Sequence, residues 1–444
     1  MSIPASTTAE QDARRLHSDN KHGHEADPGE MSIGVIIGRA AEFFDFTVFA
    51  VACVLVFPVR LFPFADPLTG TLYSFMIFAL AFIARPVGSA FFHRIDRNYG
   101  RGAKLTLAMF ILGTSTVAMG LVPTYEVLGP WAIIILCIFR LGQGFALGGT
   151  WDGLASLLAL NAPENKRGWY AMIPQLGMPI AVVIVTALFV YLVLSVSEVD
   201  FYDWGWRYPF FVAFSINVVA LFARVRLVAT PDYEELYKAS ELAPTGIRET
   251  MRSEGRSILF GALVPLSSFA LLHMLTVFPL AYVFLFTDNS PAGFLTTLLF
   301  GAIVGLIATV ASGVLSDRIG RRTLLTWATI GTGVFAIIAP VLLSFGGVGQ
   351  TVYVVLGFLL LGFSFGQASG AVASGFGKSF RYTASALTSD LAWILGAGFA
   401  PLIALYLTAT LGIWSAGAYL LSGAVVTLIA LRFTKMTATN MGRS

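Results

Sequence analysis

Charge is scarce in this sequence. Asp, Glu, Lys and Arg make up 12% of its 444 residues, about half of the roughly 25% that soluble domains carry. Hydrophobic residues make up 56%, and phenylalanine alone occurs 37 times. So little polar surface cannot cover a globule in water, whereas a bilayer accepts apolar side chains on the outside of a protein. The composition excludes an ordinary soluble globule and predicts an integral membrane protein.

Cysteine is nearly absent too. Cys53 and Cys137 lie in apolar stretches, where free cysteines usually serve as small packing residues. Two such residues give neither a disulfide framework nor a metal site. The net charge of +3 is small and gives no support to nucleic-acid binding. No short apolar core with a cleavage site follows the polar N-terminal stretch, so we expect the first apolar helix to be retained.

Long apolar runs dominate the rest of the chain. A membrane-spanning helix needs about 20 apolar residues, and twelve segments meet that length, six on each side of a charged stretch. The first six are residues 33–57, 70–92, 103–123, 130–158, 169–196 and 207–228. The second six are residues 257–287, 292–316, 323–345, 349–376, 382–408 and 411–433.

This pattern predicts an all-α membrane protein whose twelve transmembrane helices form two six-helix, pseudo-symmetric bundles. We expect the bundles over residues 32–228 and 257–434, joined by a cytoplasmic linker at residues 229–256. Residues 1–31 are expected to form a disordered cytoplasmic tail, and residues 435–444 a short second tail.

Lysine and arginine are distributed unevenly between the predicted loops. With the N-terminus inside, the outer loops keep only Arg60 and Arg207. The inner loops hold Arg94, Arg97, Arg101, Lys104, Lys166, Arg167, Arg248, Arg252, Arg256, Arg318, Arg321, Arg322, Lys378 and Arg381. Such asymmetry predicts a multi-pass protein of the bacterial inner membrane with both termini in the cytoplasm.

The two halves echo each other in their second inner loops. Asp96–Arg101 follows the second predicted helix, and Asp317–Arg322 follows the eighth. Each contains Asp-Arg followed by Gly-Arg, which indicates duplication of a six-helix unit. Transporters built from such repeats place their substrate site near the bilayer midplane, between the halves.

Several motifs resemble those of a known family. Gly313–Arg322 resembles the inner-loop signature of the major facilitator superfamily, and Arg140–Gly144 resembles its fourth-helix motif. Closer matches to the metabolite:proton symporter branch, which carries shikimate, citrate, 2-oxoglutarate, proline and betaine, occur in the branch's order: Ala41–Phe46, Ala84–Gly88, Pro174–Pro179 and Trp204–Phe210. In the C-terminal half, Arg381–Thr383 also matches.

The resemblance implies a major facilitator fold and proton-coupled symport of a metabolite. It also implies that charged inner-loop residues gate the transporter by locking helices together: Asp96, Arg97, Arg101, Asp317, Arg318, Arg321 and Arg322. The chain departs from the branch in its first inner loop, where His93 replaces a glycine and one residue is added. It departs again at Thr150, usually glutamate, and at Asp152, usually glycine, which either restores the lost acid or caps the loop.

Charged residues inside predicted helices are candidates for the mechanism, since each costs roughly 2.5–3.5 kcal/mol at a helix centre. Asp45 lies about twelve residues into the first helix, and Arg140 lies at a similar depth in the fourth. We expect them to form an ion pair, so that proton uptake by Asp45 frees Arg140 and links the proton to the substrate. A purely structural ion pair is the alternative.

Three further charged residues lie within the predicted helices. Glu42, three residues before Asp45, is a second candidate for carrying the proton. Arg85 is expected to act in gating or in helix packing. Asp390, one turn before Trp393, is the only acid well inside the helices of the C-terminal half, and is a candidate for coupling or substrate binding.

Neutral polar residues in the helices either line a pocket or form interhelical hydrogen bonds. We expect the substrate to contact Arg140 together with a set of polar and aromatic side chains: Gln143, Gln175, His273, Gln367 and Trp393.

Two enzyme-like motifs can be set aside. Gly362–Gly366 fits the nucleophile-elbow pattern, but that motif needs a strand–turn–helix and here lies in a predicted helix. Gly377–Ser379 resembles the end of a phosphate loop, but Val372 stands where the first glycine is required. We therefore predict a protein that is not an enzyme, binds no cofactor or metal, and uses an ion or solute gradient.

The leading hypothesis is uptake of a small organic acid or zwitterionic metabolite together with a proton, by alternating access. Proton-driven export of a drug or metabolite is an alternative, and a transporter-like membrane sensor is another. We expect a small-molecule substrate, protons and the lipid bilayer as partners, no nucleic acid, and a monomer.

Overall fold

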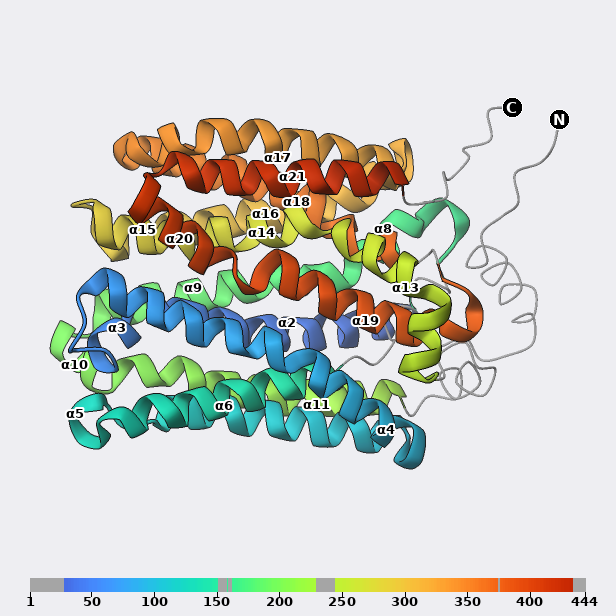
Figure 1. The fold of residues 1–444 in the computed structure, drawn as a ribbon, viewed down its shortest axis with the longest axis horizontal. Helices are drawn as coiled ribbons and strands as arrows, with labels where there is room; N and C mark the ends of the chain where they lie inside the picture. The colour runs from blue at the N-terminus through green and yellow to red at the C-terminus, as the bar shows by residue number, and fades with distance from the viewer. Residues whose placement is uncertain (1–27, 151–157, 159–161, 229–243, 374–375, 434–444) are drawn as a thin grey trace.

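The computed structural model describes residues 28–150, 158, 162–228, 244–373 and 376–433. Within these residues every regular element is a helix, and the long helices run side by side along one direction (Figure 1). Residues 1–27 of the first predicted tail, the whole second predicted tail at 435–444, most of the predicted linker, and Asp152 lie outside the described residues. Residues 28–31, predicted to belong to the first tail, are instead the start of a helix that begins at Pro28.

The chain up to Val228 forms the N-terminal half, and the chain from residue 244 forms the C-terminal half. The main N-terminal helices are α2 (Pro28–Leu55), α4 (Pro67–Leu121), α6 (Pro130–Gly149), α8 (Arg167–Met172), η3 (Ile173–Leu176), α9 (Gly177–Ser195) and α11 (Tyr208–Val228). The C-terminal half contains α13 (Ile247–Leu263), α14 (Leu266–Thr276), α15 (Phe278–Phe286), α16 (Pro291–Ile319), α17 (Arg321–Ser344), α18 (Gly346–Ala373), α19 (Arg381–Trp393), η6 (Ile394–Gly398), α20 (Ala400–Leu411) and α21 (Trp414–Phe433). Short helices join them: α3 (Phe57–Arg60), α5 (Tyr125–Leu128), η2 (Glu164–Lys166), α10 (Glu198–Asp203), η4 (Gly205–Arg207) and η5 (Lys378–Phe380).

Ten helical segments of the described chain are long and apolar enough to cross a membrane. One of them, α4, has 55 residues and a break at Gly100, and its length suffices for two crossings of about 30 Å each. Helix α2 has 28 residues, which is long enough to cross the membrane. Because it carries three charged side chains, Arg39, Glu42 and Asp45, its composition alone does not identify it as a spanning helix. With α4 counted twice and α2 included, the predicted twelve spanning helices are confirmed.

The seventh spanning helix begins earlier than predicted. Helix α13 starts at Ile247, whereas the sequence pattern predicted a start at residue 257. Arg248 and Arg252 are exposed on this first part, while Thr250 is buried. The helix is therefore amphipathic before it becomes apolar, which hid its first turns within the charged linker.

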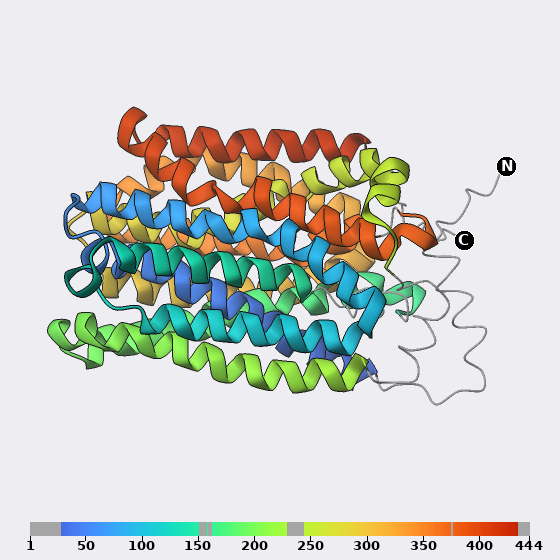
Figure 2. The same ribbon diagram turned by 60° about the horizontal axis from the view of Figure 1, so that its bottom comes forward.

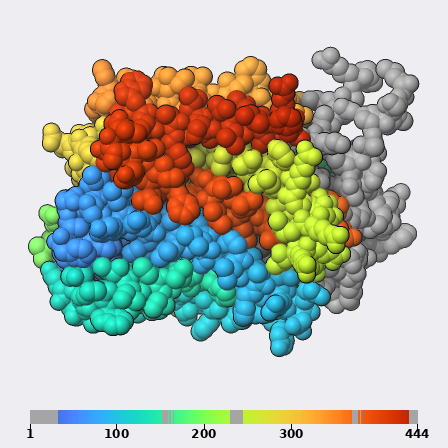
Figure 3. All heavy atoms as spheres, viewed as in Figure 1, coloured from blue at the N-terminus to red at the C-terminus, as the bar shows by residue number. Residues whose placement is uncertain are grey.

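The two halves pack side by side (Figures 1 and 2). In the space-filling view the blue-to-cyan part of the N-terminal half covers the lower region, and the red part of the C-terminal half covers the upper region (Figure 3). Helix α16 packs on α8 and α9, and helices α19 and α20 pack on α4. These contacts form the seam that a two-bundle fold requires, as predicted.

The two halves use the same device at equivalent turns. Gly100 and Gly320 have φ angles of 82° and 87°, in the left-handed region that glycine adopts without strain. Each glycine directly precedes an arginine of the duplicated loop motif, Arg101 or Arg321. We call the end of the bundle that carries these two turns the basic end; it lies at the right in Figure 1.

The starts of α4 and α16, at the opposite end, are also alike. Asp66 accepts a hydrogen bond from the backbone N–H of Thr69 at 3.1 Å, and Ser290 accepts one from Gly293 at 3.1 Å. A proline follows each capping residue at the first helical position, where its missing N–H is not needed. Shared starts and shared turns place the second helix of each half in the same way.

Candidate functional site

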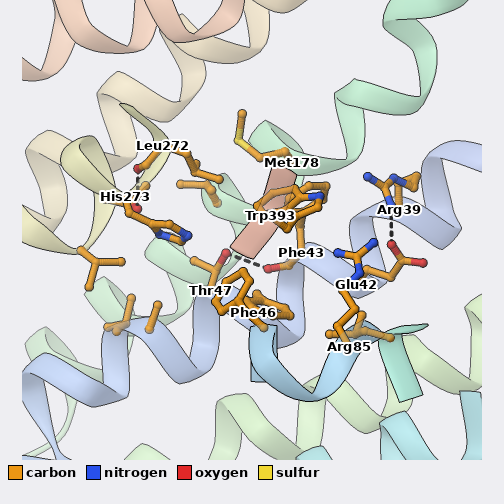
Figure 4. Close-up of a pocket in the computed structure, with 17 residues that line it drawn as sticks. Arg39, Glu42, Phe43, Phe46, Thr47, Arg85, Met178, Leu272, His273 and Trp393 are labelled. Atoms are coloured by element: carbon orange, nitrogen blue, oxygen red, sulfur yellow. Dashed lines mark hydrogen bonds and ion pairs between the residues drawn. The ribbon is translucent and has the colours of Figure 1, made fainter. Parts of the chain in front are cut away.

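A cavity lies between the two halves (Figure 4). Helices α2, α4, α6 and α9 line it from one half, and α14 and α19 line it from the other. Its lining residues are Arg39, Glu42, Phe43, Phe46, Thr47, Ala50, Val51, Phe82, Arg85, Leu147, Met178, Val182, Leu272, His273, Thr276, Val277 and Trp393. Side chains from both halves therefore face one shared space.

Aromatic rings form the middle of the cavity. The Trp393 ring lies 5.6 Å from the Phe43 ring and 6.3 Å from the Phe82 ring, centroid to centroid. The Phe46 ring lies 4.9 Å from the Phe82 ring on the same side. Figure 4 shows Trp393 and Phe43 between His273 at one end and Arg39 with Glu42 at the other. The cavity thus has a charged end and a neutral polar end, separated by aromatic walls.

Glu42 lies at the charged end, between two arginines. Its carboxylate accepts hydrogen bonds of 2.6 Å from both Arg39 and Arg224. Arg224, on α11, also donates to the backbone carbonyl of Thr150 at 3.0 Å. Gly38 leaves room for this guanidinium, because a methyl group there would overlap it. Arg224 was not among the predicted site residues, since its position near a helix end reads as a simple orientation charge.

A second ion pair at the charged end joins the two halves. Arg85 on α4 donates to Asp390 on α19 at 2.8 Å, and Ser89 also donates to the same carboxylate. Both charged side chains are buried, with 10% and 4% of their side-chain surface exposed. The Arg85 guanidinium lies 6.0 Å from the centre of the Trp393 ring. The structure therefore brings together two residues that the sequence named separately.

The predicted ion pair between Asp45 and Arg140 does not form. Asp45 accepts hydrogen bonds from Asn217 at 2.8 and 3.0 Å and from Thr116 at 3.1 Å. Arg140 donates instead to Gln143, and Gln143 donates to Thr116 at 2.9 Å. The charges are thus connected through two neutral side chains rather than by direct contact.

Arg140 is fully buried and does not line the cavity, contrary to the prediction that it contacts substrate. Its guanidinium lies 4.7, 4.0 and 4.9 Å from the ring centres of Phe46, Phe49 and Phe78. It also donates to the carbonyl of Phe78 at 3.1 Å. Methyl groups on the glycines at 144 and 148 would overlap the α4 backbone, so α6 packs closely on α4. That packing holds Arg140 behind the Phe46 ring.

Three neutral residues predicted to contact substrate lie elsewhere. Gln143 is fully buried beside Arg140, and neither it nor the buried Gln175 lines the cavity. Gln367 donates to the carbonyl of Gly168 at 3.0 Å, close to the basic end. The sequence predicts that these three glutamines are buried in the helices, but it does not predict the helix face on which each one lies.

His273 and Trp393, in contrast, line the cavity, and their contact with substrate stays a prediction. His273 is 5% exposed, and among the described residues neither of its ring nitrogens has a hydrogen-bond partner. Its ring meets those of Phe78 and Phe82 edge-on, with centroids 5.2 and 6.3 Å apart.

The first loop motif forms a buried charge cluster at the basic end. Asp96 accepts hydrogen bonds from Arg101 at 3.1 Å, from Tyr382 at 3.2 Å and from Lys104 at 3.5 Å. Lys104 also donates to the Tyr382 hydroxyl at 2.8 Å, and the Arg101 guanidinium lies 4.1 Å from the centre of the Tyr382 ring. Tyr382 belongs to the C-terminal half, so the cluster links the halves despite the irregular loop sequence.

The second loop motif links the halves by capping a helix. Asp317, at the end of α16, accepts backbone hydrogen bonds from Gly168 at 2.6 Å and from Trp169 at 3.1 Å. These N–H groups belong to the first turn of α8, whose orphan donors and positive dipole end favour a carboxylate. Arg321 donates to the carbonyl of Arg167 at 3.2 Å in the same region. Both motifs thus connect the halves at the basic end.

Three of the predicted gating residues take no part in these described contacts. Arg97, Arg318 and Arg322 are exposed at the surface of the basic end. No group of three or more His, Cys, Asp or Glu residues in the described chain could hold a metal ion.

The sequence profile of the Major Facilitator Superfamily matches residues 35–401. The chain is 34% identical to the inner membrane metabolite transport protein YhjE of Escherichia coli over 437 residues, covering 96% of this chain and 97% of that protein. It is 27% identical to the shikimate transporter of Escherichia coli, covering 91% of this chain and 94% of that protein. In fold it is similar to the proton:xylose symporter XylE, with a TM-score of 0.69 at 17% identity, covering 93% of this chain and 97% of that one.

These matches agree with an all-α major facilitator fold. The relatives are named as transporters rather than as enzymes, in agreement with the rejection of both enzyme-like motifs. The chain belongs to the major facilitator superfamily and is a multi-pass membrane transporter of metabolites.

Proposed function

We propose that this protein takes up a small organic acid or zwitterionic metabolite together with a proton, by alternating access across the inner membrane. The observation that carries the proposal is the cavity between the halves, with Arg39, Glu42 and Arg85 at its charged end. The basic end of the bundle would face the cytoplasm, in keeping with the distribution of lysine and arginine. The names of two relatives, an inner membrane metabolite transport protein and a shikimate transporter, support this proposal.

The charged end suits a carboxylate. Arg39, Arg85 and Arg224 supply three positive charges there, and Glu42 and Asp390 supply two negative ones. With all five ionised, the net charge of this group is +1, which one substrate carboxylate would neutralise. A guanidinium can hold a carboxylate with two parallel hydrogen bonds, which an ammonium cannot. Arg39 and Arg85 are the cavity-lining groups for this contact.

Asp45 is the better candidate for carrying the proton. All of its described hydrogen-bond donors are neutral side chains, those of Asn217 and Thr116. Protonation of Asp45 therefore breaks no described ion pair, whereas protonation of Glu42 would remove the partner of two arginines. The hydrogen bonds through Thr116 and Gln143 connect Asp45 to Arg140, which packs against the Phe46 ring of the cavity wall. A change of protonation at Asp45 could therefore alter the position of that ring.

The contacts between the halves fit a state of the alternating-access cycle that is closed toward the cytoplasm. The described hydrogen bonds of Asp390, Asp96 and Asp317 join the halves, the first beside the cavity and the other two at the basic end. Opening toward the cytoplasm would require these three links to break. In this state substrate would enter the cavity from the opposite end.

Uptake into proteoliposomes under an imposed pH gradient tests the proposal. Because the solute is unidentified, purified protein would first be screened against carboxylates, amino acids and betaines by thermal shift, since a ligand raises apparent stability by mass action. The best binder should accumulate when the interior is alkaline and should only equilibrate without a gradient. Uptake indifferent to the gradient would sink proton coupling, and accumulation by energised everted vesicles would indicate export.

The orientation has its own test. In a variant lacking Cys53 and Cys137, a cysteine at the exposed Ser197 should react with an impermeant thiol reagent from outside intact cells, and one at the exposed Ser253 should not. Reversed labelling would overturn the assignment of the basic end to the cytoplasm.

A further inference from the structure

His273 stands out among the polar groups of the cavity, because it is buried without a hydrogen-bond partner in the described structure. Buried polar groups are nearly always satisfied, so an orphan in a cavity wall points to a missing partner. A neutral imidazole has one N–H donor and one nitrogen acceptor. The rings of Phe78 and Phe82, which meet the imidazole edge-on, carry no atom that forms a normal hydrogen bond with the N–H. They offer nothing to the acceptor nitrogen.

Two threonines close to His273 in the cavity wall are acceptors as well. The Thr47 hydroxyl donates to the carbonyl of Phe43 at 2.7 Å, and the Thr276 hydroxyl donates to the carbonyl of Leu272 at 2.8 Å. Each hydroxyl has a single proton, and that proton is already used. The Thr47 and Thr276 oxygens can therefore only accept further hydrogen bonds. Among the described residues this end of the cavity therefore offers three acceptors, the His273 nitrogen and two threonine oxygens, but only one donor, the His273 N–H.

A cation is a poor occupant for this end. The acids of the charged end are already paired, Glu42 with two arginines and Asp390 with Arg85. The Arg140 guanidinium lies 4.9 Å from the centre of the Phe78 ring, and His273 packs against the same ring. A second positive charge would be placed near Arg140, and Asp45, the acid close to Arg140, is fully buried and does not line the cavity. An uncharged donor has no such penalty, and a hydroxyl is the simplest one.

We infer that His273, with Thr276 and Thr47, forms a subsite that binds hydroxyl groups of the substrate at the end of the cavity opposite Arg39. This inference rests on the proposed function and narrows its substrate class to hydroxylated carboxylates. It makes His273 a specificity-determining residue. A site built to hydrogen-bond a hydroxyl strongly disfavours an analogue lacking it, because the buried protein groups then stay unpaired. Carboxylates without hydroxyl groups should accordingly bind more weakly.

Matched pairs of carboxylates test the subsite on the purified full-length protein. Shikimate and cyclohexenecarboxylate form one pair, and glycerate and propionate form another; within each pair only hydroxyl groups differ. We expect the wild type to bind the hydroxylated member of at least one pair tenfold or more tightly. His273→Phe should abolish that preference while binding the hydroxyl-free member as before. His273→Gln, which keeps an acceptor and a donor, should restore part of the preference.

Folding of the variants is checked by the melting temperature without ligand. Phenylalanine preserves the ring contacts with Phe78 and Phe82, so His273→Phe should melt close to the wild type. Thr276→Val removes one acceptor at constant shape and should reduce the preference less than His273→Phe does. No preference in the wild type for either pair, or a preference that survives in His273→Phe, would overturn the subsite. Hydroxyl-dependent binding without proton-driven uptake would instead refute the proposed function and leave the subsite standing.

Discussion

Among the described residues the N-terminal half buries eight charged side chains, whereas the C-terminal half buries two, Arg381 and Asp390. The two halves nevertheless share the number of spanning helices, the way in which α4 and α16 begin, and the glycine turns of their loop motifs. The C-terminal half contributes His273, Trp393 and one carboxylate to the region of the cavity. Duplication therefore preserved the scaffold, while the ionisable chemistry became concentrated in one half.

The two loop motifs also differ in buried charge, with more of it in the N-terminal half. Asp96 in the first half is 1% exposed and meets two cations and a tyrosine hydroxyl, whereas Asp317 in the second half is bound by two backbone N–H groups. One sequence pattern thus supports a buried charge cluster in one place and a helix cap in the other. The difference follows from what the opposite half presents, a tyrosine side chain in one case and a helix N-terminus in the other.

The largest effect should come from Asp45→Asn. This substitution removes the proposed proton carrier from the half that holds most of the buried charges. Asparagine keeps the size and an acceptor oxygen for Asn217 and Thr116 but cannot carry a proton. The variant should bind substrate and exchange it across the membrane, yet fail completely to accumulate it in proteoliposomes under a pH gradient. Glu42→Gln is the matched control and should weaken binding rather than coupling. Accumulation that persists in the double variant would move the proton site, with Asp390 next to be tested.

Asp390→Asn should have the next largest effect, because it leaves Arg85 as an unpaired buried cation. Breaking a buried pair costs about 3–5 kcal/mol, here taken from the state in which the halves are joined. A cysteine at Leu147, in a background without Cys53 and Cys137, should then react faster with reagent added from the basic end.

The control for that experiment removes both charges. Arg85→Met combined with Asp390→Leu replaces the pair by apolar groups, which is often close to neutral for buried pairs. This double variant should label more slowly than Asp390→Asn alone. Equal labelling of both variants would show that the pair does not hold the seam closed.

A direct comparison of the two loop motifs should give a smaller, graded effect. Asp96→Asn removes the charge between Arg101 and Lys104 and should slow transport strongly. Asp317→Asn keeps one acceptor for the first turn of α8 and loses the favourable charge at that helix end, worth about 1 kcal/mol. Transport rates of the two variants at matched expression should therefore differ, with Asp96→Asn slower. Equal rates would mean that both motifs act only through their net charge.

The smallest effects should come from the exposed arginines. Arg97→Gln and Arg318→Gln remove charge from the basic end without touching the described seam contacts, and each should keep a transport rate close to that of the wild type. Melting temperature and initial uptake rate measure this directly. A loss as large as that of Asp317→Asn would show that surface charge, rather than the contacts at the seam, sets the gate.

Much of the fold could be predicted from the sequence. Twelve apolar runs, a charged stretch between two sets of six, and repeated Asp-Arg and Gly-Arg loops led to the correct architecture, because bilayer thickness and the positive-inside bias act on local sequence. Helix α2 shows where this reasoning stops. It carries Arg39, Glu42 and Asp45, too many charges for composition alone to identify a spanning helix, although it lies within the bundle. Its partners, not its own composition, explain how it is tolerated.

The candidate site was predicted in part. Buried charge in an apolar segment identified Glu42, Asp45, Arg85, Arg140 and Asp390 as unusual, and all five are buried. Which of them meet was decided by helix rotation and by close glycine contacts between α4 and α6. Depth along a helix can be counted from the sequence, so Asp45 and Arg140 were matched by depth alone. The direction in which each side chain points could not be counted in the same way.

The sequence by itself determined the membrane location, the helix number, the twofold repeat and the family, because each depends on composition or on short motifs. Only the tertiary structure decided that Glu42 lies between Arg39 and Arg224 and that Arg85 meets Asp390. It also decided that His273 faces the cavity without a hydrogen-bond partner among the described residues. Such pairings join residues up to 305 positions apart in the chain. They depend on how twelve helices rotate and tilt against one another, and that is set by the sum of all their contacts rather than by any local pattern.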